Sequence, residues 1–192
     1  MPKIVDHDER RQELILFAAD YIADHGLENT SFRKLAAAGG FSQNLVSHYF
    51  ANKEELLWRV QEYVSRRSIE RYQAVEDKSL VNIVFQQLPF DREREVEAKV
   101  FMNFWTLITH NAQLRDSYCR FSAVSRNQLK KTIIGQIEAG LVSDTARVDT
   151  LVDMIVSLTT SLCTVILLDP THFTRPRCKR LIAESLGDYV LH

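Results

Sequence analysis

The stretch "GGFSQNLVSHYF", residues 39–50, decides the fold of this chain. Its glycine pair ends one helix, Ser42 can cap the next, and apolar residues follow at a spacing that holds a short helix against its neighbours. The other side chains share the outward face of that helix: Gln43, Asn44, Ser47 and His48. Short amides and hydroxyls in this arrangement suit base edges and phosphates in a DNA major groove. An uncommitted polar surface helix would look the same, so the surrounding sequence has to decide.

Helical periodicity predicts helices on both sides of this stretch. The N-terminal helices are expected at 9–25, at about 30–39, at 42–50, and from a capping box at Asn52 and Glu55 onward. Further helices are expected at about 79–88, 92–110, 113–139, 145–168 and 174–190, and no run alternates as a strand would. We therefore predict an all-α protein, with a three-helix helix-turn-helix domain at 1–50 and a larger helical domain at 51–192.

The charge pattern is local rather than global. A formal net charge of −1 gives the chain no general attraction to nucleic acid. Residues 29–53 nevertheless carry Arg33, Lys34 and Lys53 and no acidic residue. A phosphate backbone responds to that local field, and Lys53 would add its charge to the free amides at the start of a helix.

Other signals argue against a membrane protein, a metalloprotein and the common enzyme classes. The apolar run at 151–168 contains Asp153 and five Ser or Thr residues, which favours a buried helix over a membrane span. Cys119, Cys163 and Cys178 lie far apart without metal-ligand spacing, so we expect a reducing cytoplasmic setting, no metal and no cofactor. The string "GFSQN" lacks the last glycine of GxSxG, and HExxH, P-loop and GxGxxG motifs are absent.

The N-terminal third resembles a known family. The strings "RRQELILFAADYIADHG" and "TSFRKLAAAGGFSQNLVSHYFANKEELL" look like the DNA-binding domain of TetR-type transcriptional regulators, over about residues 10–57. The resemblance implies phosphate binding by Ser31, Arg33 and Ser42, base reading by Gln43, Asn44 and Ser47, and backbone anchoring by His48, Tyr49 and Lys53. Asn44 stands where glycine is frequent in the family, and Gly39 where alanine is frequent. The docking mode is therefore implied, while the operator sequence is not readable.

A second resemblance extends over most of the chain. The strings "LPFDREREVEAKVFMNFWTLITHNAQLRDSY" and "LLDPTHFTRPRCKRLIAESL" are similar to the TetR branch that contains the choline-responsive betaine regulator. This implies a homodimer, formed through the helices near 145–168 and 174–190, that a small-molecule effector releases from a palindromic DNA operator. The branch makes a quaternary amine such as choline a possible effector.

Aromatic side chains on the predicted helix 92–110 add a candidate effector site. The residues that would line it are Phe101, Phe104, Trp105 and Ile108, together with Tyr118 and Phe121. Ring faces can hold an organic cation, although aromatic residues at helical spacing also form ordinary cores. Two rival functions remain: an all-α enzyme acting on a small hydrophobic or cationic molecule, and a constitutive architectural DNA binder.

Overall fold

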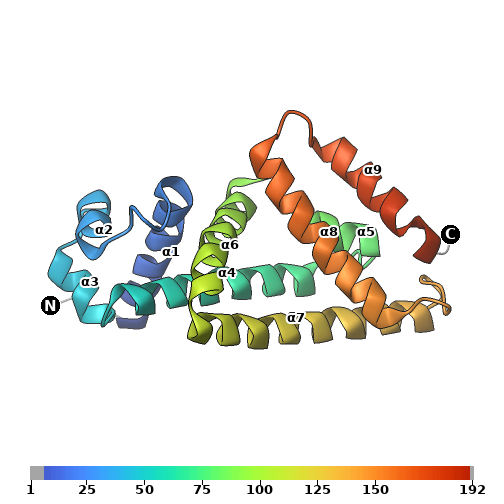
Figure 1. The fold of residues 1–192 in the computed structure, drawn as a ribbon, viewed down its shortest axis with the longest axis horizontal. Helices are drawn as coiled ribbons and strands as arrows, with labels where there is room; N and C mark the ends of the chain where they lie inside the picture. Colours follow the sequence, from blue (N-terminus) through green and yellow to red (C-terminus); the bar gives the residue numbers. More distant parts are fainter. Residues whose placement is uncertain (1–6, 191–192) are drawn as a thin grey trace, which may run out of the picture.

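The computed structural model describes residues 7–190, and helices dominate the described part of the chain (Figure 1). The α-helices are α1 (His7–His25), α2 (Phe32–Gly39), α3 (Gln43–Tyr49), α4 (Lys53–Ala74), α5 (Leu80–Phe85), α6 (Arg92–His110), α7 (Ala112–Glu138), α8 (Val148–Leu168) and α9 (Arg175–Leu186). A 3₁₀ turn at Gly187–Tyr189 follows α9. The predicted all-α class is confirmed. Residues 1–6 and 191–192, the outer ends of the two predicted domains, lie outside the described residues.

Two predicted boundaries differ from the structure. The helix expected from residue 145 begins at Val148, because the Ser143 hydroxyl accepts the amide of Thr145 at 3.3 Å and holds a turn there. The helix expected to reach residue 190 ends at Leu186, where the chain tightens into the 3₁₀ turn. Both differences lie at helix ends, where side-chain hydrogen bonds compete with the helix.

The molecule is elongated (Figure 1). The helices α1 to α3 lie at one end of its long axis, and α8 and α9 lie toward the other end. Two hydrophobic clusters correspond to these ends: the first joins α1 to α4 with α6, and the second joins α5, the last part of α7, α8 and α9. We call α1 to α3 the head and the rest of the helices the body. Consequently α4 and α6 contribute to the core of the head, and both also continue into the body.

Ion pairs fix α6 against its neighbours. At the N-terminus of α6, Arg92 pairs with Asp20 at 3.1 Å and with Asp24 at 2.8 Å, both on α1. Deeper in the structure, Arg71 of α4 pairs with Glu97 of α6 at 2.5 Å. Burial raises the pKa of the Glu97 carboxyl, and the hydrogen bond from Arg71 opposes that rise. Breaking a buried pair of this kind costs about 3–5 kcal/mol, so α4 and α6 are coupled along their length.

Candidate nucleic-acid interface and internal cavities

The helix α3 presents the polar face that its sequence predicts. Its N-cap, Ser42, accepts a hydrogen bond from the amide of Leu45 at 3.1 Å. Val46 is 2% exposed, and Phe50, which follows the helix, is 1% exposed, so both anchor α3 in the first cluster. The outward residues are all exposed: Gln43, Asn44, Ser47 and His48. A short, anchored helix with a solvent-facing polar side is what major-groove reading requires.

The turn before α3 is tightly packed. Gly40 has φ +67°, and the amide of Phe41 donates to the carbonyl of Ala36 at 2.9 Å, which closes the end of α2. The Phe41 ring packs edge-on against Phe17 of α1, with centroids 5.4 Å apart. A Cβ at Gly39 would lie 2.6 Å from Phe41 Cδ2 and 2.9 Å from Phe17 Cε1. An alanine at residue 39 would therefore meet both rings.

The remaining predicted DNA contacts surround α3. Ser31 caps α2 by accepting the amide of Lys34 at 3.2 Å, and Arg33 is exposed on the same helix. The Tyr49 hydroxyl is hydrogen-bonded to His7 of α1. In this structure the Nζ of Lys53 donates to the carbonyl of Leu27 at 2.9 Å. That contact ties the start of α4 to the loop between α1 and α2.

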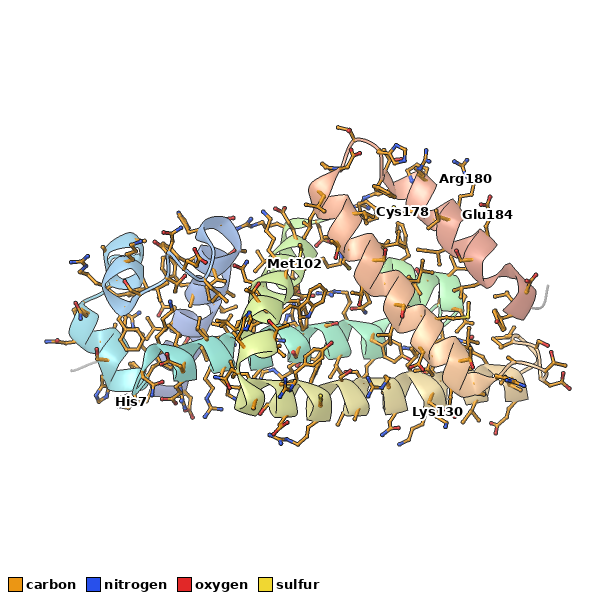
Figure 2. All side chains as sticks on the ribbon, in the orientation of Figure 1. His7, Met102, Lys130, Cys178, Arg180 and Glu184 are labelled. Carbon is orange, nitrogen blue, oxygen red and sulfur yellow. The ribbon has the colours of Figure 1, made fainter. Side chains whose placement is uncertain are left out.

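Two residues near this surface were missed by sequence reasoning. The Nδ1 atom of His7 lies 3.0 Å from the Tyr49 hydroxyl, and Figure 2 shows His7 at the same end of the molecule as α3. Arg11 pairs with Glu55 of α4 at 3.0 Å and lies over the ring of Phe50. The doublet at residues 10 and 11 was visible in the sequence, whereas nothing local connects His7 with Tyr49.

The body of the protein contains a cavity of about 260 Å³, here called cavity one, between α4, α5, α6, α7 and α8. Four predicted effector contacts line it: Phe101, Trp105, Tyr118 and Phe121. Tyr72 adds a fifth aromatic ring, and its hydroxyl donates to Thr132. Among the described residues, no Asp or Glu lines this cavity. Burial raises the pKa of the Cys163 thiol in its wall to about 12, so this cysteine stays protonated.

The structure separates the other two predicted effector contacts from this group. Phe104 and Ile108 belong to the first hydrophobic cluster and line a second cavity of about 660 Å³, here called cavity two, between α4, α6 and α7. Phe101 and Trp105 occupy a neighbouring strip of α6 that faces cavity one. The six predicted contacts therefore do not all line one cavity, although Tyr118 and Phe121 line both cavities.

The head and body together define a helix-turn-helix regulator, and comparison with known proteins gives its family. Residues 14–60 match the family described as bacterial regulatory proteins, tetR family, and residues 77–190 match the BetI-type transcriptional repressor, C-terminal. The chain belongs to the TetR family, with a BetI-type C-terminal domain, and is a transcriptional repressor of that type. Both resemblances seen in the sequence are thus confirmed.

Individual relatives agree with this assignment. The regulator PksA of Bacillus subtilis (strain 168) is 27% identical over 194 residues, covering 97% of this chain and 92% of that protein. The regulator BetI of Cronobacter sakazakii (strain ATCC BAA-894) is 26% identical over 155 residues, covering 77% and 75%. These relatives are transcriptional regulators that act through a helix-turn-helix.

Solved structures establish the fold. A transcriptional regulator from Saccharomonospora viridis, in complex with choline, superposes with a TM-score of 0.82 at 21% identity, covering 96% of this chain and 100% of that one. A TetR transcription regulator from Haloarcula marismortui gives a TM-score of 0.81 at 15% identity, with the same coverage.

Proposed function

We propose that this repressor is a homodimer that binds a palindromic operator through α3 and leaves it when a small molecule enters cavity one. The observation that carries the proposal is the exposed polar face of α3, set on a helix that Ser42 caps and Val46 anchors. Gln43, Asn44 and Ser47 would read base edges from this face. The division into a DNA-binding domain at 1–50 and an effector-binding and dimerisation domain at 51–192 is part of the proposal.

The surface of α8 supports dimerisation. This helix is long and apolar enough to span a membrane by length and composition, yet only 28% of its apolar window is buried within the chain. Met154 is 36% exposed and Leu168 is 72% exposed, and an open groove runs between α8 and α9. A second copy that packs α8 and α9 against their equivalents would cover this surface. We prefer that partner to a bilayer, because Asp149 and Asp153 lie in the first half of the helix.

The effector would act through α4 and α6. Both helices line cavity one, and both contribute to the core of the head, so a conformational preference in the body can move the head. A differential affinity of about 1–3 kcal/mol between two conformers would change operator affinity about 5- to 150-fold. The aromatic lining suits cation–π contacts, and the choline bound to the Saccharomonospora viridis regulator makes quaternary amines the first class to test.

The proposal includes a cytoplasmic protein that has no catalytic activity and needs no metal or cofactor. Its relatives are bacterial transcriptional regulators. Residues 7–190 contain no group of three or more His, Cys, Asp or Glu side chains placed to hold a metal ion. An all-α enzyme would instead turn over its ligand and show no sequence preference on DNA.

Selection of bound fragments from random duplex DNA tests the proposal. A dimer should enrich a palindrome whose half-sites lie about one helical turn apart, or slightly more. The effector class is tested separately with choline. Calorimetry measures whether choline binds, and a second assay measures whether it releases the selected DNA. Enrichment of no sequence, or of a single unrepeated half-site, would contradict the dimeric reading mode.

A further inference from the structure

Cavity two is lined by a glutamine whose buried side-chain oxygen has no hydrogen-bond donor among the described residues. Gln61, in the first half of α4, is 6% exposed and lines this cavity. Its Nε2 donates to the hydroxyl of Ser65 at 3.2 Å, whereas no described residue donates to its fully buried Oε1. A buried amide oxygen without a partner is costly, and most such groups in native proteins are satisfied by protein, water or ligand.

The walls around Gln61 are aromatic. Trp58, Phe104, Tyr118 and Phe121 all line the cavity, together with aliphatic side chains from α6 and α7. The space of about 660 Å³ exceeds what a single water would need to satisfy the amide. The size and chemistry therefore suit an apolar molecule with one polar end.

Most of the charges at the rim of cavity two have ion-pair partners. Glu62 pairs with Arg59 at 3.0 Å, and Glu70 pairs with Arg66 at 3.7 Å and with Arg67 at 3.4 Å. The lining thus offers no uncompensated carboxylate for a cation, whereas Arg120, whose Nη2 donates to the Ser117 hydroxyl at 2.9 Å, forms no ion pair with the described residues. A cation would meet no free carboxylate there, and an anion would pair with Arg120 but could not donate a hydrogen bond to Oε1 of Gln61.

We propose that cavity two is a second small-molecule site, which binds an uncharged aromatic compound that donates a hydrogen bond to Oε1 of Gln61. Phenols represent this class. The site is distinct from cavity one and goes beyond the effector proposed there, although the two cavities share Ile69, Tyr118 and Phe121 as walls.

The two tryptophans of the chain give each cavity its own reporter. Trp58 lines cavity two and Trp105 lines cavity one. Their indole N–H signals in a proton–nitrogen NMR spectrum can be assigned with Trp58→Phe and Trp105→Phe. Phenol should move the Trp58 signal in a saturable way. Anisole, which has the same ring and no O–H, should bind less tightly despite being the more apolar compound.

Substitution of Gln61 tests the hydrogen bond itself. In Gln61→Met, the ratio of phenol affinity to anisole affinity should fall about tenfold, because the acceptor is gone while the volume is nearly kept. Gln73→Met is the matched control, since Gln73 lines the same cavity from an exposed position and should leave the ratio unchanged.

Each alternative outcome overturns the proposal. A phenol response confined to Trp105 would place the ligand in cavity one. An unchanged affinity ratio in Gln61→Met would remove the amide from recognition. If that variant does not fold, the wild-type comparison decides alone, and tighter binding of anisole than of phenol would refute the site. None of these readouts depends on DNA, so they are independent of the operator experiments.

Discussion

The turn between α2 and α3 makes a quantitative prediction for Gly39→Ala. The added Cβ would lie 2.6 Å from Phe41 Cδ2 and 2.9 Å from Phe17 Cε1, where ordinary contact begins at 3.4 Å. The Phe41 ring, whose Cε2 would lie closer still, would have to move by about 1.1 Å and the Phe17 ring by about 0.5 Å, although both rings are only partly buried. Overpacking of this kind costs about 1–3 kcal/mol, and alanine recovers at most about 1 kcal/mol in helix propensity. A net loss near 1 kcal/mol lowers the Tm of a chain of this size by about 2–4 °C.

Thermal unfolding of Gly39→Ala, Phe41→Leu and the double variant tests whether the contact with the Phe41 ring is the cause of the loss. Because Phe41→Leu removes the ring that the new methyl group meets, the two substitutions together should destabilise less than their sum, by about 0.5–3 kcal/mol. Gly40→Ala is the control. Nothing lies within 4 Å of a Cβ there, and its positive φ costs about 1–2 kcal/mol whether or not Phe41 is present. A Gly39→Ala protein that melts like wild type, with additive effects, would refute the steric argument.

Three further predictions concern capping, thiol chemistry and pH. Ser42→Ala should cost about 1 kcal/mol in thermal unfolding by removing the cap of α3, and an unchanged Tm would speak against the cap. Ellman's reagent at pH 8 should react quickly with exposed Cys119 and slowly with Cys163, because a pKa of about 12 leaves roughly one thiol in ten thousand ionised; a fast phase that survives Cys119→Ser would disagree. The hydrogen bond from Arg92 lowers the pKa of Asp24 below its ordinary value of 3.8. The stabilisation from this ion pair is therefore fully present above pH 3.8 and is lost as the pH falls through the lower pKa of Asp24 in the folded protein. Arg92→Met should therefore melt below wild type at neutral pH and converge with it in strong acid, and a constant difference across the pH range would contradict this.

Local signals predicted most of the fold. The predicted N-cap at Asn52 is confirmed, because its side chain accepts the amide of Glu55 at 2.8 Å; the Glu55 carboxylate accepts the amide of Ala51, one residue before the cap, at 2.8 Å. The polar and buried faces of α3 also follow the predicted pattern. These features depend on residues a few positions apart, so periodicity and capping chemistry reveal them.

Contacts between distant residues could not be predicted in the same way. Lys53 bonds to Leu27, 26 residues earlier, and His7 meets Tyr49, 42 residues later. The division of the α6 aromatics between two cavities depends on how α4 and α7 pack around that helix. A sequence pattern identifies an aromatic face, but which neighbour each ring meets is a property of the tertiary structure.

We propose above that the outward face of α3 reads duplex DNA. The direct measurement is the affinity of wild type and Gln43→Ala for a set of operators that carry every single-base substitution, with the exposed, distant Gln73→Ala as control. Gln43→Ala should lose discrimination at one position in each half-site, by about 1–3 kcal/mol, and keep it elsewhere. An identical base-preference profile for Gln43→Ala and wild type would contradict it.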